Sequence, residues 1–373
     1  MTLSPFIKWA GGKQKELKYI IPNFPDKFNR YLEPFVGGGA VYLSIDMVND
    51  LYINDKSPEL INLYMAIREQ DKTFFDKLQE INNSWIALED TVLKHASSFM
   101  NMYKDYSNGI INGMQLHELI TEFMLNHSLE FISSLYMSFN INLNNYIKEI
   151  EKNLINKTMR MKKIEAKKGR LCEDDILDNI ECAFKSAFYM HFRYLYNNIN
   201  ELNINKSIST AIFYFIREYC FSSMFRYNKK GEFNVPYGGI SYNRKDFSKK
   251  IEYLKCDKLV SHLKNTSIFN LDFQHFFSVV APSKGDFMFI DPPYDSYFST
   301  YANNAFSQAD HKRLAEHLYA TDAYFLLIIK NTDLIHSLYY DKGFKIQAFD
   351  KKYLVSFQNR NDKDAEHLII TNY

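Results

Sequence analysis

Hydrophobic and polar positions follow two different patterns in different parts of the chain. Between Pro58 and Pro236 there is no proline, and glycine is rare. Apolar side chains recur in this interval at helical spacing, as at Leu116, Leu119, Ile120, Phe123 and Met124, and again at Phe184, Phe188, Phe192 and Leu195. An interval with so few helix breakers and this periodicity is predicted to be mostly helical.

Outside this interval, the apolar residues form short runs that end at Gly, Asp or Pro. The runs are 31–36, 51–53, 287–290 and 323–329, and helical stretches separate them. Such runs are typical of a parallel α/β sheet whose functional loops follow the carboxyl ends of its strands. We therefore expect one sheet domain split between residues 1–75 and 258–373, interrupted by a largely helical insertion at 76–257.

Composition and charge limit the class of protein. The 373 residues are 46% hydrophobic and 24% charged, so the chain can bury a large core. A net charge of +1 argues against a protein that binds phosphates with its whole surface, but it leaves room for a local basic groove. No run approaches the roughly 18 apolar residues of a membrane span, and no signal peptide is evident. We expect a soluble, cytoplasmic protein with no membrane partner.

The cysteines and histidines predict no metal site. Cys172, Cys182, Cys220 and Cys256 are too far apart for C-x-x-C pairs, so reduced, structural cysteines are expected. None of the ten histidines is expected to pair with a cysteine or a carboxylate at a metal-ligand spacing.

The first motif with chemical meaning is a glycine-rich loop, EPFVGGG at residues 33–39, after the first predicted strand. Its glycines let the backbone turn tightly and approach a ligand with no Cβ in the way. Asp55 ends the next strand, where a carboxylate can accept hydrogen bonds from ribose hydroxyls. The pair suggests a nucleotide-like ligand. The alternative is a plain turn followed by a strand-end cap.

The sharpest motif is Asp291-Pro292-Pro293-Tyr294, directly after the apolar run 287–290. Two prolines stiffen the loop, so the carboxylate and the aromatic ring form a rigid polar and stacking site at the rim of the sheet. The exocyclic amine of a planar base fits this site. The Asp291 carboxylate and the Pro292 carbonyl can accept its two hydrogens while Tyr294 stacks on the ring. An ordinary Asp-Pro-Pro turn is the alternative.

Five spaced motifs resemble the Dam-like family (D12 class, alpha group) of DNA adenine-N6 methyltransferases, in the family's order. They are FIKWAGGK at 6–13, the loop at 33–39, Asn54-Asp55, RYNKKGEFNVPYG at 226–238, and DPPY at 291–294. The resemblance does not cover about 76–205. It implies a Rossmann-like S-adenosylmethionine-dependent methyltransferase sheet with an inserted target-recognition domain. The implied cofactor is S-adenosyl-L-methionine, and the implied substrate is double-stranded DNA.

The resemblance also implies roles for single residues. The catalytic residues would be Asp291, Pro292, Pro293 and Tyr294. The cofactor would be bound by Trp9, Lys13, Phe35, Gly37, Gly39, Asp55 and Asp291, with Asp272 and Phe273 beside its adenine, at the end of a strand that begins at Ser267. The DNA contacts would be Lys8, Phe221, Arg226, Tyr227, Asn228, Lys229, Lys230 and Pro236. Phe221-Ser222-Ser223 replaces the aromatic-Asn-Gly step of many relatives, which puts a GATC target in doubt.

These assignments predict direct in-line methyl transfer to adenine N6 after the base has been flipped out of the duplex. One alternative is a methyltransferase that acts on another planar amine or amide, such as cytosine N4 or a protein glutamine. The other is a non-catalytic, DNA-binding relative. If the enzyme serves a restriction system, its cognate restriction endonuclease is a genetic rather than a physical partner.

A second basic run lies in the insertion, between Lys157 and Arg170. One interpretation is a solvated helix face or a linker. The other is a phosphate-binding arm that widens the contact with DNA.

Overall fold

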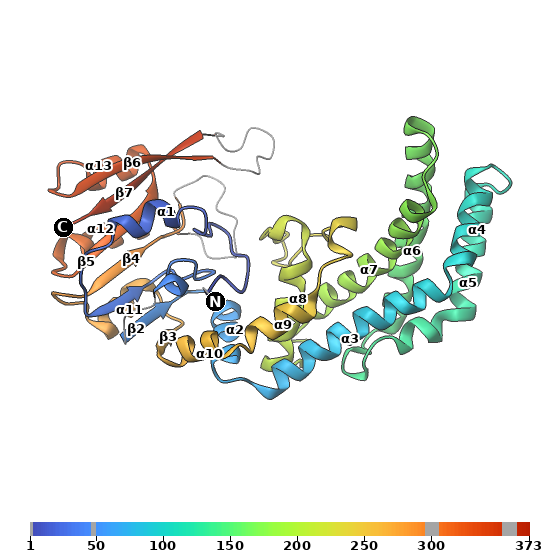
Figure 1. Ribbon diagram of the computed structural model, residues 1–373, viewed down its shortest axis with the longest axis horizontal. Coiled ribbons are helices and arrows are strands. Elements are labelled where there is room, and N and C mark those ends of the chain that lie inside the picture. The colour runs from blue at the N-terminus through green and yellow to red at the C-terminus, as the bar shows by residue number, and fades with distance from the viewer. Residues whose placement is uncertain (1–2, 46–49, 295–305, 353–363) are drawn as a thin grey trace. The chain divides into compact units, whose positions relative to one another are not determined.

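A computed structural model describes residues 3–45, 50–294, 306–352 and 364–373 (Figure 1). The chain divides into two compact units. The sheet unit comprises residues 1–70, 225–227 and 254–373, and the helical unit comprises residues 71–224 and 228–253. Within the described ranges, no helix combines the length and the apolar character needed to cross a membrane.

The sheet unit contains seven strands in its described residues, in the order β3-β2-β1-β4-β5-β7-β6. The strands are β1 (Arg30–Glu33), β2 (Asp50–Asn54), β3 (Thr266–Phe269), β4 (Phe287–Ile290), β5 (Tyr324–Lys330), β6 (Lys345–Lys352) and β7 (Asp364–Thr371). The first five pair in parallel, whereas β7 is antiparallel to both β5 and β6. The strand order reverses between β1 and β4, which is the point where Rossmann-like sheets bind ligands at the carboxyl ends of their strands.

Side chains from alternate strand positions build the core of the sheet unit. Leu32 and Met288 lie in a large apolar cluster with three helices, α11 (Phe273–Val280), α12 (Gln308–Ala320) and α13 (Asp333–Tyr339). Their neighbours Tyr31 and Phe287 point to the opposite face, where their ring centroids are 5.9 Å apart. Two more helices, α2 (Pro58–Arg68) and α10 (Asp257–Lys264), pack against each other and against β3, and a short helix α1 spans Leu17–Ile20.

The predicted strands are all present, as β1, β2, β4 and β5, but two details differ. β1 ends at Glu33 instead of Val36, because Pro34 has no N–H for a sheet hydrogen bond. The expectation that Asp272 and Phe273 end a strand was wrong. β3 ends at Phe269, and the Asp272 side chain accepts a hydrogen bond from the Gln274 amide, 3.0 Å away, to cap α11.

The helical unit confirms the predicted helical interval. Its helices are α3 (Lys72–Lys94), α4 (Ala96–Ser107), α5 (Gly113–Ser133), α6 (Leu143–Lys168), α7 (Glu173–Asn197) and α8 (Lys206–Tyr219), and α9 (Phe247–Leu254) follows at its border. Several begin at a side chain that caps the first turn, such as Asp71 for α3 and Asn112 for α5. The aromatic core is centred on Trp85, whose ring lies 4.8 to 6.0 Å from those of Phe188, Phe215, Tyr219 and Tyr237.

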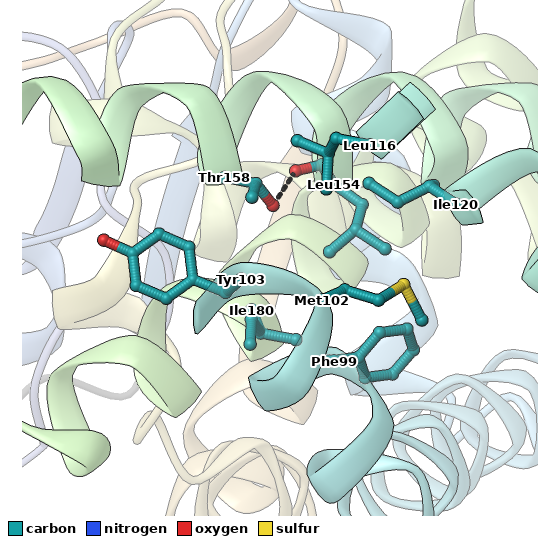
Figure 2. Close-up of a pocket in the computed structure, with 8 residues that line it drawn as sticks. All are labelled: Phe99, Met102, Tyr103, Leu116, Ile120, Leu154, Thr158 and Ile180. Atoms are coloured by element: carbon teal, nitrogen blue, oxygen red, sulfur yellow. Dashed lines mark hydrogen bonds between the residues drawn. The ribbon is translucent and has the colours of Figure 1, made fainter. Parts of the chain in front are cut away.

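Packing in the helical unit leaves a small pocket between α4, α5, α6 and α7, lined by Phe99, Met102, Tyr103, Leu116, Ile120, Leu154, Thr158 and Ile180 (Figure 2). The Thr158 hydroxyl hydrogen is already used within α6, because it is donated to the Leu154 carbonyl, 2.8 Å away. The cavity volume is about 10 Å³, which is room for one water at most. It is a packing gap and is too small for a cofactor.

Candidate active site

Asp291, the residue after β4, forms an ion pair with Lys13. The Lys13 Nζ lies 2.5 Å from the Asp291 Oδ2 and 5.3 Å from the centre of the Tyr294 ring, and it also donates to the Gly11 carbonyl at 2.8 Å. Burial lowers the pKa of the Lys13 ammonium, but the Asp291 carboxylate and, less strongly, Tyr294 outweigh it and raise the pKa above its usual range. A buried, charged lysine therefore connects the N-terminal motif to the DPPY loop.

Asp55, the residue after β2, holds two backbone amides. Its Oδ2 accepts from the Gly37 N–H at 3.0 Å, and its Oδ1 accepts from the Ser57 N–H at 2.9 Å, so it connects the glycine loop to the start of α2. Burial raises the pKa of the Asp55 carboxyl to about 6, although the hydrogen bonds from Ser57 and Gly37 oppose the rise. The Asp55 carboxyl is thus mostly ionised at neutral pH, which is only slightly above its pKa.

The glycine loop needs glycine at Gly37 and Gly39. Their φ angles are +50° and +71°, which other residues adopt at a cost. A Cβ on Gly37 would lie 2.9 Å from the Cδ1 of Trp9, and one on Gly39 would lie 2.5 Å from the Tyr64 hydroxyl. Trp9 therefore lies directly on the loop. The Trp9 ring also contacts that of Phe225, at 4.4 Å between ring centroids.

Two buried polar residues support these loops, and the sequence analysis gave neither a role. The Asn54 side chain joins three strand ends, since its Nδ2 donates to the carbonyls of Pro34 and Leu271, each at 3.0 Å, and its Oδ1 accepts from the Leu271 N–H at 2.8 Å. Glu33 accepts a hydrogen bond from the Tyr31 hydroxyl at 2.6 Å. Burial raises the pKa of Glu33 well above its usual range despite this bond, and the nearby Asp291 adds to the rise. Both residues fix the backbone that carries the site.

An aromatic cluster lies beside the glycine loop. The ring centroids of Phe35, Phe273 and Phe306 are each 5.6 Å from the other two. Arg313 covers the Phe273 ring at 4.7 Å and pairs with Asp272 at 3.2 Å. The predicted residues Phe35, Asp272 and Phe273 are thus brought together, whereas Phe306 and Arg313 were missed because only the fold places them there. The cluster offers flat apolar surface for a planar ring.

The predicted DNA contacts are divided between the two units. Lys8, Arg226 and Tyr227 belong to the sheet unit, and Phe221, Asn228, Lys229, Lys230 and Pro236 belong to the helical unit. All are exposed except Tyr227 and Asn228, which are half-buried. In the helical unit, the Asn228 Oδ1 accepts from the N–H groups of Lys230 and Glu232, at 2.9 and 3.0 Å, and forms a tight turn. The turn leaves Lys229 and Lys230 exposed.

A buried arginine shapes the backbone next to Phe221. The Arg217 guanidinium donates to the carbonyls of Met224, at 2.6 Å, and Ser223, at 3.0 Å. Ser222 and Ser223 both have positive φ angles, +52° and +51°, which non-glycine residues seldom adopt. The sequence analysis missed Arg217, because a charged residue in a helix is usually exposed. It is a positioning residue for the segment that carries Phe221.

The sheet is parallel over its first five strands and carries a glycine loop after β1, an acid after β2 and an ion-paired carboxylate after β4. This arrangement is typical of Rossmann-like enzymes, which bind their ligands at the carboxyl ends of the strands. The sequence profile of the D12 class N6 adenine-specific DNA methyltransferases matches residues 9–131 and 121–355. The chain belongs to this family. It is therefore an enzyme that methylates adenine N6 in DNA and uses a methyl donor. The family match favours adenine as the target over the alternatives of cytosine and protein glutamine.

Two individual relatives are similar over their whole length, and a third over most of it. The Type II methyltransferase M.CviBI of Paramecium bursaria Chlorella virus NC1A is 25% identical over 376 residues, which cover 100% of both chains. M.MjaIII of Methanocaldococcus jannaschii is 24% identical over 391 residues, again 100% of both. The DNA adenine methylase of Haemophilus influenzae is 24% identical over 320 residues, 84% of this chain and 73% of that protein. The similarity thus extends through residues 76–205, which the motifs alone did not cover.

Proposed function

We propose that the chain transfers the methyl group of S-adenosyl-L-methionine to adenine N6 at a specific site in double-stranded DNA, in the cytoplasm. The observation that carries the proposal is the ion pair between the buried Lys13 and Asp291 after β4, in the same unit as Asp55 and the glycine loop. The ion pair fixes a carboxylate at the carboxyl end of β4, on the edge of the sheet where Rossmann-like proteins bind ligands.

The residues of the sheet unit fit this cofactor, which supplies an electrophilic methyl group on a sulfonium. Asp55 accepts hydrogen bonds from the ribose hydroxyls, and the bare backbone at Gly37 and Gly39 allows close approach. Phe35 and Phe273, with Asp272, flank the adenine ring. Trp9 and Lys13 complete the binding site from the N-terminal motif.

The catalytic step depends on how the target amine is held. Adenine N6 is a poor nucleophile, because its lone pair is delocalised into the ring. The Asp291 carboxylate and the Pro292 carbonyl accept the two amine hydrogens, which restores lone-pair density toward the methyl group. Lys13 favours the carboxylate form of Asp291, an acceptor only. Transfer would be direct and in line, with no covalent enzyme intermediate: the methyl–sulfur bond would break as the N6–methyl bond forms, a neutral thioether would leave, and N6 would release one proton to solvent.

The target base must leave the helix to reach this site. Flipping costs a few kcal/mol. Stacking on Tyr294, worth about 1–3 kcal/mol by analogy with single-strand binding, offsets much of that cost.

We assign catalysis to residues 1–75 and 258–373 and target recognition to residues 76–257. In the recognition segment, Arg226 reads a base edge, whereas Lys229 and Lys230 contact phosphates. Lys8, Phe221, Tyr227, Asn228 and Pro236 complete the DNA contacts. In a restriction system, the cognate endonuclease is a partner only in the genetic sense.

The test is expression of the full chain in a host without DNA methylation, followed by sequencing that identifies modified bases. We expect N6-methyladenine at one short sequence. A tritiated methyl group on S-adenosylmethionine should appear in duplex DNA incubated with the purified enzyme. A folded chain that yields N4-methylcytosine, or no methylated base, would refute the proposal.

A further inference from the structure

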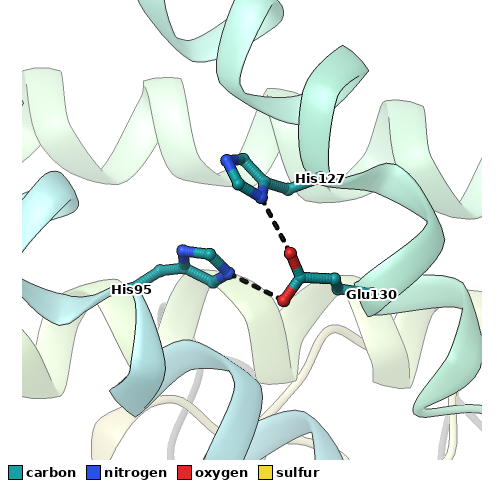
Figure 3. Close-up of side chains that lie close together, drawn as sticks. All are labelled: His95, His127 and Glu130. Carbon is teal, nitrogen blue, oxygen red and sulfur yellow. Dashed lines mark hydrogen bonds and ion pairs between the residues drawn. The ribbon is translucent and has the colours of Figure 1, made fainter.

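Three side chains that are good metal ligands meet in the helical unit (Figure 3). His95 lies between α3 and α4, and His127 and Glu130 lie one turn apart on α5. The His95 Nε2 is 3.1 Å from the Glu130 Oε2, and the His127 Nδ1 is 2.9 Å from the Glu130 Oε1. One ligand atom from each residue lies within 4.8 Å of the other two. The expectation that none of the ten histidines pairs with a carboxylate at a metal-ligand spacing was wrong for His127, which faces Glu130 three residues later on α5.

We propose that His95, His127 and Glu130 bind a divalent transition-metal ion, and that zinc is the ion they suit best. Two imidazole nitrogens and one carboxylate oxygen are typical three-residue zinc ligands, with water in the fourth position. With bonds of about 2.0–2.2 Å, ligand atoms of a tetrahedral zinc site lie about 3.3 Å apart. In the structure the two histidine nitrogens lie 2.9 and 3.1 Å from different oxygens of Glu130, and one ligand atom from each of the three residues lies within 4.8 Å of the other two. These atoms would therefore have to approach one another by up to about 1.5 Å to bind one ion, which side-chain rotation can supply.

The surroundings of the three ligands are partly apolar. The ring of Phe123 lies 4.5 Å from that of His127 and 5.2 Å from that of His95, and Phe131 lies 6.1 Å from His95. The His95 side chain is only 10% exposed, whereas those of His127 and Glu130 are each 34% exposed. An ion can therefore enter past His127 and Glu130, and the apolar residues restrict water on the other side.

Lys94 is the cation that competes for this site. Its Nζ lies 2.5 Å from the Glu130 Oε2, and its side chain is 65% exposed. An exposed ion pair contributes little to stability, so Lys94 can leave Glu130 without a large cost. An ion bound in its place would link α5 to the junction of α3 and α4.

The same helix provides a matched control. The His117 Nε2 lies 3.5 Å from the Glu151 Oε1, and within the described part of the chain no third ligand joins this pair. His117, 61% exposed, and His127, 34% exposed, are thus two histidines on α5 that each face a carboxylate. They differ in the presence of a third ligand.

The test is titration of the chelator-treated, full-length chain with zinc, followed by calorimetry. Cobalt is used in parallel, because its visible absorption reports four-coordinate geometry. We expect one ion per chain and a rise in melting temperature with zinc. His127→Ala and Glu130→Gln should each weaken zinc binding about 100-fold or more, beyond the 10–100-fold that changes around the ligands produce. His117→Ala should leave the affinity unchanged.

Circular dichroism establishes that each variant is folded, and the partial exposure of His127 and Glu130 makes unfolding by substitution unexpected. The proposal is overturned if the folded wild-type chain binds neither zinc nor cobalt. It is also overturned if His117→Ala reduces binding as much as His127→Ala, because zinc would then bind surface histidines without selection.

Discussion

The sheet unit and the helical unit hold their candidate functional groups in different ways. In the sheet unit, charged groups lie at strand ends and are paired, Asp291 with Lys13 and Asp55 with two backbone amides. In the helical unit, the candidate DNA contacts other than Asn228 are exposed, and Arg217 and Asn228 fix the backbone that carries them. Chemistry needs groups whose orientation is set before the substrate arrives, whereas recognition needs side chains that DNA can reach on a shaped backbone.

The largest expected effect is on the paired carboxylate of the sheet unit. Asp291→Ala should lower methyl transfer by about 10³-fold or more, because the amine loses its charged acceptor. Asp291→Asn keeps the shape of the side chain and removes only its charge, and it should lower the rate of methyl transfer nearly as much. Tritiated methyl transfer to DNA measures the rate, and circular dichroism monitors the fold. A folded Asp291→Ala enzyme with normal activity would remove the basis of the comparison.

The next largest effect concerns the aromatic core of the helical unit. Trp85→Ala should lower the free energy of unfolding by about 3–5 kcal/mol, the usual cost of deleting a large buried aromatic side chain. Leu93→Ala, on the exposed face of the same helix, is the control and should stay within about 0.5 kcal/mol of wild type. Denaturant unfolding measures both. Equal losses of unfolding free energy in the two variants would mean that the Trp85 cluster does not stabilise the helical unit.

The raised pKa of Asp55, in the sheet unit, predicts that stability and cofactor affinity both depend on pH. Its pKa is raised from 3.8 to about 6, so its contribution to stability is full below pH 4 and is lost as the pH rises through 6. Binding of S-adenosylmethionine needs the carboxylate form, so affinity should fall about tenfold for each pH unit below 6. Calorimetry between pH 5 and 7 tests this. The Asp55→Asn variant should bind weakly at every pH, and a wild-type affinity that does not change with pH would contradict the assignment.

The smallest effect is expected from the exposed lysines of the helical unit. The double variant Lys229→Ala, Lys230→Ala should reduce the slope of log affinity for DNA against log salt by roughly 2, about 0.9 for each lost phosphate contact. The basic run of the insertion is helical through Lys168, as part of α6, so it is not a linker. A second variant, with Lys163, Lys167 and Lys168 neutralised, tests whether this face of α6 also contacts phosphates. If neutralising these three also reduces the slope, α6 binds DNA. An unchanged slope assigns them to a solvated face.

Local patterns predicted the parts of the fold and site that depend on neighbouring residues. The apolar runs gave the positions of β1, β2, β4 and β5, and the residues that end them, Asp55 and Asp291, are the charged groups of the sheet site. A strand followed by a polar loop is a local feature, so a single sequence is enough to find it.

The pairings that the sequence did not predict join residues far apart in the chain. Lys13 meets Asp291 across 278 residues, and His95 meets Glu130 across 35. β7 lies between β5 and β6, although it follows both in the sequence. Neither periodicity nor spacing reports such pairings, because packing of the whole unit determines them.

The pairing of β1 with β4 also sets an order of events while the chain is being made. Tyr31 pairs with Phe287, and the whole helical unit is synthesised between β2 and β4. At ~5–20 residues per second, β4 follows β2 by about 10–50 s. Near the end of that interval the helical unit is complete through residue 253, whereas β1, which precedes the glycine loop, still lacks its neighbour β4. The nascent enzyme would thus gain its recognition half before it gains the ability to methylate.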